Sequence, residues 1–91
     1  MSTAVVVHQA GVPTRSLTNA QAAVLSHLLQ NGPQTDEVLV ETYEPRGSRP
    51  RQAPSGLRTR RNELVELGFV GWTGNTKVTK YNRRAAEWRA L

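Results

Sequence analysis

Residues 54–70 read PSGLRTRRNELVELGFV, a pattern typical of a short helix that runs directly into a strand. Ser55 can cap the helix start, because a serine oxygen accepts a hydrogen bond from an otherwise unpaired backbone N–H group. Gly68 can end the helix, because glycine adopts the left-handed conformation at little cost. Phe69 and Val70 then begin the predicted strand.

This predicted helix has an apolar side and a polar side. At about 100° per residue, Leu64 and Val65 project near Leu57. The opposite side carries Arg58, Thr59, Asn62 and Glu66. Arginine, threonine and asparagine can hydrogen-bond to base edges or phosphates, so we expect this side to contact a partner. The simpler alternative is that this side of the helix only faces solvent and contacts no partner.

Composition limits the kind of protein. A chain of 91 residues makes one small domain, and the absence of cysteine excludes disulfides and cysteine-ligated metals. No apolar run approaches the ~20 residues that span a bilayer, so we expect a cytoplasmic protein without membrane contact. His8 is isolated from other possible ligands, and neither histidine is near a plausible nucleophile. We therefore expect no metal, no cofactor and no catalytic residue.

The net charge of +5 is unevenly distributed. Residues 1–45 hold one arginine against four carboxylates, residues 46–84 hold ten Lys and Arg against two, and residues 85–91 are neutral. Such polarity is expected of a protein that binds a polyanion, most commonly nucleic acid.

Two further helices are predicted before the central one. The first spans residues 18–31, with Thr18 and Gln21 at capping-box spacing and an apolar stripe that includes Leu28 and Leu29. His27 within it is expected to be exposed or partly packed. The second spans residues 35–44 and is capped by Thr35.

The remaining segments are a terminal arm, a loop and a pair of strands. Residues 1–16 are predicted to be a flexible arm, whose valines at 5–7 can form a strand on the domain or across a homodimer. Residues 45–54 form a loop, and its arginines either are solvated or contact phosphates. These are Arg46, Arg49 and Arg51. Residues 69–73 form a strand, Gly74-Asn75 indicates a turn, and residues 85–91 favour a second strand over a short helix.

The chain resembles small winged helix-turn-helix DNA-binding proteins, including many from actinobacterial phages. The resemblance lies in residues 54–70, in Thr35–Val38, and in residues 79–85 with Trp88, and it covers residues 17–91. It implies an α+β fold of three helices followed by a two-stranded antiparallel wing. Two features depart from the family pattern: the loop at 45–54 is long, and Asn82 stands where a wing glycine is common.

The leading hypothesis is non-enzymatic binding of double-stranded DNA, as a transcriptional regulator or recombination accessory factor. The central helix would enter the major groove, with Arg58, Thr59 and Asn62 on base edges and Ser55 near a phosphate. Arg60 belongs to the same candidate set. On the wing, the residues expected to contact phosphates are Lys77, Lys80, Arg83 and Arg84. The alternative is a protein-interaction module for an acidic partner, such as a host or phage regulatory protein.

Arg61 is predicted to differ from its basic neighbours. It projects at about 40°, between Leu57 and Val65, so its charge needs a partner close to the apolar core. Asp36 or Glu37 of the second helix can supply that partner. The rival role for Arg61 is a phosphate contact reached by extending past the core.

Overall fold

The computed structural model describes residues 5–9, 12–47 and 49–91, and this part of the chain contains three helices and five strands. The strands are β1 (Val5–Gln9), β2 (Val12–Leu17), β3 (Gln34–Thr35), β4 (Val70–Val78) and β5 (Arg84–Ala90). The helices are α1 (Asn19–Asn31), α2 (Asp36–Thr42) and α3 (Pro54–Leu67). The predicted α+β class and the predicted helices are confirmed. The main sheet is larger than predicted, because it includes β3 as a third strand.

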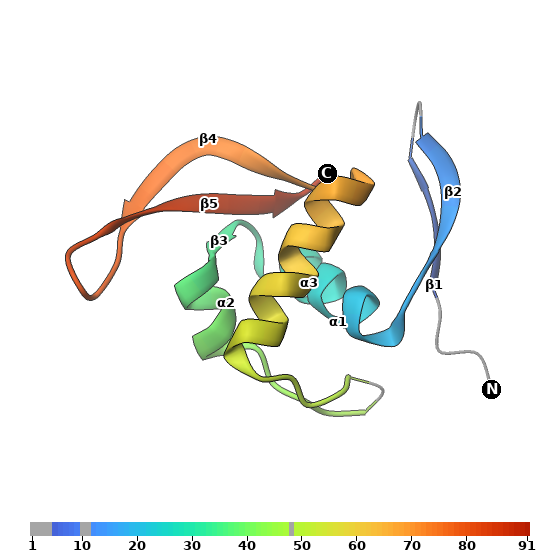
Figure 1. Cartoon of the computed structure of the whole chain (residues 1–91), viewed down its shortest axis with the longest axis horizontal. Helices are drawn as coiled ribbons and strands as arrows, with labels where there is room; N and C mark the ends of the chain where they lie inside the picture. The colour runs from blue at the N-terminus through green and yellow to red at the C-terminus, as the bar shows by residue number, and fades with distance from the viewer. Residues whose placement is uncertain (1–4, 10–11, 48) are drawn as a thin grey trace.

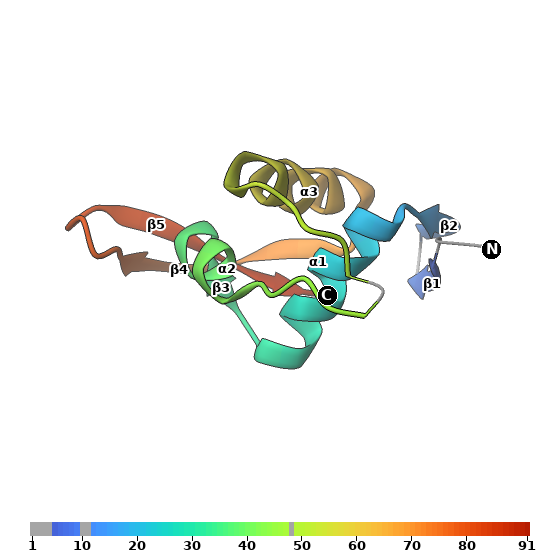
Figure 2. The same cartoon turned by 90° about the horizontal axis from the view of Figure 1, so that it is seen from below.

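The helices gather in the middle of the molecule, and α3 lies on one outer side of them (Figures 1 and 2). The β4–β5 hairpin extends away from the helices at one end (Figure 1). The β1–β2 hairpin stands at the other end and forms a sheet of its own. The two hairpins therefore lie at opposite ends of the molecule, with the helices between them.

The segment predicted to be a flexible arm contains regular structure. β1 pairs antiparallel with β2, and Val5 lies opposite Leu17. The valine run does form a strand, but its partner is β2, in a sheet separate from the main one. Residues 1–4, 10 and 11 lie outside the described residues. Flexibility of the arm and pairing across a homodimer stay predictions.

Side-chain caps begin α1 and α2 as predicted. The Thr18 hydroxyl accepts a hydrogen bond from the Gln21 N–H at 3.2 Å, and the Gln21 side chain accepts one from the Thr18 N–H at 3.1 Å. The α1 helix ends at Gly32, whose φ is 79°. Thr35 caps α2, because its hydroxyl accepts from the Val38 N–H.

The start of α3 differs from the prediction. The helix begins at Pro54 and its N-cap is Ala53, which makes no side-chain capping bond. Proline suits the first helical position, because its φ is already helical and the N–H it lacks would be unpaired there. Ser55 therefore lies inside the first turn and is not the cap. The predicted end is confirmed, since Gly68 has φ 88° and ψ 12°.

One apolar cluster joins the helices to the main sheet. Leu57 and Leu64 project into it from α3 with 2% and 0% exposure, so the predicted packing side of this helix is confirmed. On α1, Leu29 is 65% exposed, which contradicts its predicted place in the apolar stripe. Leu28 of the same predicted stripe is buried as expected, and Val24 is buried as well. The helix is rotated so that its buried side includes a polar residue, His27, in place of Leu29.

His27 is 2% exposed, so the expectation of an exposed or partly packed residue is wrong. Its Nε2 lies 2.9 Å from both Gln34 Oε1 and Thr42 Oγ1, and its Nδ1 lies 3.3 Å from Asn31 Nδ2. These partners satisfy the ring nitrogens and make burial tolerable. Burial lowers the pKa of His27 from its ordinary value of 6.5, and the charge of Arg49 acts in the same direction.

The main sheet is antiparallel in the order β3-β5-β4, so β5 is its central strand. Trp88 of β5 has a partner on each neighbouring strand. These partners are Gln34 of β3 and Trp72 of β4. The predicted strand over residues 85–91 is confirmed as β5, and its helical rival is wrong.

The turn predicted at Gly74-Asn75 is wrong. β4 runs through both residues, and its pairing with β5 is irregular between Trp72 and Thr76. Gly74 has φ 93°, and the Asn75 carbonyl accepts a hydrogen bond from the Trp72 indole at 2.8 Å. The glycine therefore serves a bulge within a strand. The hairpin turns at residues 79–83, where Asn82 adopts φ 58°.

The long loop before α3 is held against the domain by polar contacts. The Tyr43 hydroxyl donates to the Pro50 carbonyl at 2.6 Å. Gln52 donates to the Ala20 carbonyl of α1 at 3.2 Å and to the Tyr43 hydroxyl at 3.3 Å. These contacts fix the direction in which the chain enters α3.

Candidate nucleic-acid interface

The outer side of α3 exposes the three residues predicted to reach base edges, Arg58, Thr59 and Asn62. The Thr59 hydroxyl donates to the Ser55 carbonyl at 2.9 Å, and the Asn62 amide donates to the exposed Glu66 carboxylate at 3.2 Å. Arg58 makes no hydrogen bond or ion pair with another described residue. Its guanidinium is therefore available to an outside ligand.

Arg60, which belongs to the predicted DNA-binding set, is engaged within the domain. Its guanidinium donates to both Glu63 carboxylate oxygens, at 2.6 and 3.1 Å. Gln21 of α1 donates to the same carboxylate at 3.0 Å. Donation from Arg60, and then from Gln21, lowers the pKa of Glu63. Glu63 therefore connects Arg60 to Gln21 of α1, and the Arg60 guanidinium is used within the domain.

Arg61 makes the structural contact that its helical projection predicts. Its guanidinium donates to both Asp36 oxygens at 2.8 and 2.7 Å. The two side chains are only 13% and 23% exposed. The guanidinium also lies 4.1 Å from the centre of the Trp88 ring, a favourable cation–π geometry. Arg61 therefore fastens α3 to both α2 and β5.

Lys77 lies on the surface of the hairpin that faces away from α3, so it is not placed to bind a ligand together with α3. It pairs in register with Ala85, and its ammonium is 4.0 Å from the Glu87 carboxylate. Successive side chains of a strand point to opposite surfaces. Trp88 points toward α3, where it meets Arg61. Lys77 therefore lies on the opposite surface, in line with Glu87.

The other three cations predicted to act on the wing lie at the hairpin tip or next to it. The Lys80 ammonium pairs with Glu41 of α2 at 3.1 Å. Arg84 is exposed and donates to the Thr76 hydroxyl at 3.2 Å. Arg83 is exposed, and its guanidinium has no partner among the described residues. Only the two arginines of this group are without a carboxylate partner in the described part of the chain.

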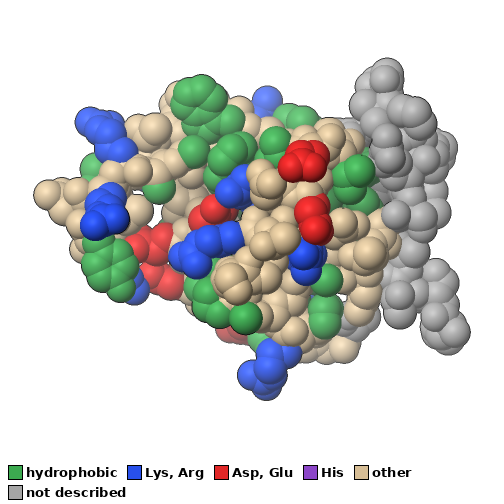
Figure 3. Space-filling model, in the orientation of Figure 1, with side chains coloured by type: hydrophobic (Ala, Val, Ile, Leu, Met, Phe, Trp, Pro, Cys, Tyr) green, Lys and Arg blue, Asp and Glu red, His purple; other side chains and the backbone are tan. Residues whose placement is uncertain are grey.

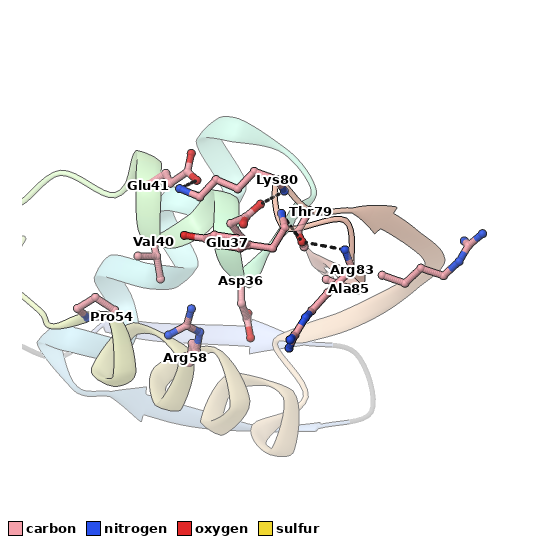
Figure 4. Close-up of a pocket in the computed structure, with 12 residues that line it drawn as sticks. Asp36, Glu37, Val40, Glu41, Pro54, Arg58, Thr79, Lys80, Arg83 and Ala85 are labelled. Carbon is pink, nitrogen blue, oxygen red and sulfur yellow. Dashed lines mark hydrogen bonds and ion pairs between the residues drawn. The ribbon is translucent and has the colours of Figure 1, made fainter.

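A groove of about 510 Å³ separates the N-terminal half of α3 from the hairpin tip. Pro54 and Arg58 line it from α3, and Figure 4 shows them across the groove from α2 and the tip. Its other lining residues are Asp36, Glu37, Val40, Glu41, Thr79, Lys80, Tyr81, Arg83, Arg84 and Ala85. The groove therefore brings together one predicted base-contacting residue and three of the predicted wing residues.

The carboxylates in the groove are all engaged from within the molecule. Asp36 is held by Arg61, and Glu41 is paired with Lys80. Glu37 accepts a hydrogen bond from the Lys80 backbone N–H at 3.2 Å. Among the described lining residues, Arg58, Arg83 and Arg84 have no carboxylate partner, and the Arg83 side chain extends outward from the groove (Figure 4). The groove therefore has the charge expected of an anion-binding surface.

The loop arginines are not part of this groove. Arg49 donates to Gln30 of α1 at 2.7 Å, and Arg46 lies 3.9 Å from Glu44. Both line a separate polar hollow beside His27. Arg51 is exposed and makes no ion pair with the described residues. The phosphate contacts predicted for these three arginines stay predictions.

Charged side chains of both signs are visible on the side of the molecule that carries α3. Figure 3 shows Lys and Arg side chains over the β4–β5 hairpin at the left and over the middle of this side. Acidic side chains lie to the right of them and also beside the hairpin, among the basic groups. Basic groups on this side of the molecule are therefore found on both α3 and the hairpin, with carboxylates between them.

Sequence reasoning missed the two glutamates that hold the hairpin tip. Glu37 and Glu41 are four residues apart, so they share one side of α2. That spacing is the available signal, because it indicates two carboxylates that can share one cationic partner. Their partner, Lys80, lies 39 or more positions along the chain, and only the fold brings it to α2.

A metal site and a membrane-spanning helix are two further possibilities for the described residues. No group of three or more His, Asp or Glu side chains there could hold a metal ion. No helix in the same residues has both the length and the apolar character to cross a membrane. Comparison of the chain with family models, with curated proteins and with solved structures finds no match.

Proposed function

We propose that this chain is a non-enzymatic winged helix-turn-helix protein that binds double-stranded DNA. In this proposal α3 is the recognition helix and the β4–β5 hairpin is the wing. The order of the elements supports the proposal, since α2 and α3 lead directly into the hairpin. The contact between Arg61 and Asp36 also supports it, because it holds α3 on α2 and leaves the polar side of α3 outward.

One observation carries the proposal. Arg58 of α3 and Arg83 and Arg84 of the hairpin line one groove, while the carboxylates beside them are engaged by other groups. A surface of this kind attracts a phosphate backbone over a distance and holds it by charge-assisted hydrogen bonds.

The expected complex follows from this arrangement. The major groove of B-DNA, about 12 Å wide, admits a helix such as α3. Arg58 would bind a guanine edge and Asn62 an adenine edge, exchanging its exposed bond to Glu66 for the base. Ser55 lies in the first turn of α3, where a phosphate is favoured by the helix dipole. Arg83 and Arg84 would bind phosphates beside the groove.

Selection from a pool of random duplexes, followed by fluorescence anisotropy over a range of salt concentrations, tests the proposal. Arg58→Ala is expected to weaken binding to the selected site by about 1–3 kcal/mol and to relax preference at one or two base pairs. Arg89→Ala is the matched control. Arg89 is also exposed, but it lies on the sheet surface opposite Trp88, so its removal should leave base preference unchanged.

Two results would count against DNA binding. One is a parent protein whose affinity for duplex DNA does not depend on salt. The other is a pair of variants, at Arg58 and Arg89, with equal effects on affinity and preference. If the proposal holds, the protein acts by occupying a site, as a regulator of transcription or an accessory factor in recombination.

A protein-interaction module for an acidic partner is the second candidate. Trp72 and Val78 are 57% and 62% exposed on the hairpin, and large exposed apolar side chains are common at protein interfaces. This candidate predicts that Trp72→Ala abolishes capture of the partner while any weak binding to random DNA is unchanged.

A further inference from the structure

The tip of the β4–β5 hairpin is an internally bonded turn. The Thr79 N–H donates to the Arg83 carbonyl at 2.7 Å, and the Asn82 N–H donates to the Thr79 carbonyl at 2.9 Å. The Thr79 hydroxyl also accepts from the backbone N–H groups of Tyr81 and Arg83, each at 3.3 Å. The tip is therefore expected to move as one unit, and its position depends on what it contacts outside itself.

Two carboxylates of α2 supply that outside contact. Glu37 accepts a hydrogen bond from the Lys80 backbone N–H, and Glu41 pairs with the Lys80 ammonium. Figure 4 shows both carboxylates directed toward Lys80. A single residue of the tip is thus held twice, through its main chain and through its side chain.

We propose that Glu37, Glu41 and Lys80 form a latch that positions the hairpin tip, and that Lys80 is therefore not a phosphate contact. This inference rests on the proposed DNA binding. The latch sets where Arg83 and Arg84 lie relative to Arg58 across the groove. The three latch residues are positioning residues, and the DNA would be bound by the arginines.

The electrostatics of Lys80 fit this role. Its hydrogen bond and charge interaction with Glu41 raise the pKa of Lys80, so the ammonium is already balanced in the free protein. A phosphate would have to displace Glu41 from it. The ion pair is exposed, at 57% and 49%, and exposed pairs stabilise only weakly. Loss of one partner should therefore shift the tip without unfolding the domain.

The sign of the effect of Glu41→Gln on DNA affinity tests the latch. Removing a carboxylate from a DNA-binding protein ordinarily raises its affinity for DNA, because repulsion of phosphates falls. A latch predicts the opposite, a loss of about two- to five-fold, the range expected from an exposed ion pair. Glu44→Gln is the matched control. Glu44 is also an exposed carboxylate, but it does not touch the tip, so its removal should leave affinity unchanged or slightly raised.

Two further variants separate a latch from a direct contact. Lys80→Met should lower affinity without changing the slope of affinity against salt. Arg83→Met should flatten that slope by about one unit, because it removes a phosphate contact. The exchanged pair, Lys80→Glu with Glu41→Lys, should recover most of the parent affinity. If Glu41→Gln behaves like Glu44→Gln, or if Lys80→Met flattens the slope as Arg83→Met does, the latch is overturned.

Amide hydrogen exchange tests the latch without DNA. Glu37→Ala removes the acceptor of the Lys80 N–H and should speed exchange at this amide, with core amides unchanged. Unchanged exchange at Lys80 overturns the latch. Faster exchange at Lys80 in a protein that does not bind DNA overturns the proposed function and leaves the contact itself established.

Discussion

Arg60 and Arg61 are neighbours in the sequence, yet they bind different parts of the molecule. Arg60 pairs with Glu63 on the same helix, whereas Arg61 reaches Asp36 of α2 and lies over Trp88. The Arg61 pair is the more buried of the two. Removing its guanidinium leaves Asp36 charged and partly desolvated, which is more costly than the loss of a helix-surface pair.

Arg61→Met is therefore expected to lower the free energy of unfolding by roughly 1–3 kcal/mol. Arg60→Met, the matched control, should cost less than about 1 kcal/mol. Urea denaturation followed by tryptophan fluorescence measures both. DNA affinity per folded molecule should survive Arg61→Met. Unchanged stability with a flatter salt slope would instead make Arg61 a phosphate contact.

His27 gives the protein a predicted dependence on pH. Its folded-state pKa is lowered by burial, while the unfolded chain should titrate near 6.5. As pH falls below this value, the unfolded state binds a proton that the folded state resists, so stability is lost. The loss should be complete below the folded-state pKa. Melting temperatures should therefore fall as pH is lowered from 7 toward 5.

An NMR titration of the imidazole C–H resonances checks the cause. The His27 midpoint in the folded protein should lie below its midpoint in urea. Equal midpoints would show that another group produces any decline in stability over this range of pH.

At the scale of elements, α3 depends on the leucine at the centre of its packing side. Leu64 is fully buried, so Leu64→Ala should lower the free energy of unfolding by about 2–5 kcal/mol. Leu29→Ala is the control on α1, because Leu29 is 65% exposed and its truncation removes little packing. Thermal melts compare the two. Similar losses would show that α1 is rotated from its described position.

The elements that could be predicted are those set by local chemistry. The caps at Thr18 and Thr35 and the stop at Gly68 depend on neighbouring residues, and all three are confirmed. The predicted cap of α3 is wrong because serine and proline both favour the start of a helix. The helix begins at Pro54, so Ser55 lies within its first turn. The bulge at Gly74 was predicted as a turn, because a glycine with positive φ serves either structure and only pairing with β5 decides between them.

At the scale of the whole molecule, the excess of positive charge in residues 46–84 was evident from the sequence, but its arrangement was not. The fold places these lysines and arginines on several different parts of the molecule. Arg60 and Arg61 are used within the domain, Arg49 binds α1, and Lys80 binds α2. Helical projection found the Arg61 contact because a charge near a core needs a partner. No local rule reveals that Lys80 meets a helix nearly forty residues earlier.

The bulge in β4 has a consequence for how the molecules behave at high concentration. β4 is an edge strand with Trp72 and Val78 exposed, and a straight strand of this kind can template the addition of another chain. The positive φ of Gly74 interrupts the regular row of unpaired backbone groups, and the Trp72 indole already occupies the Asn75 carbonyl. The irregularity that bends the hairpin thereby also protects its outer edge against aggregation.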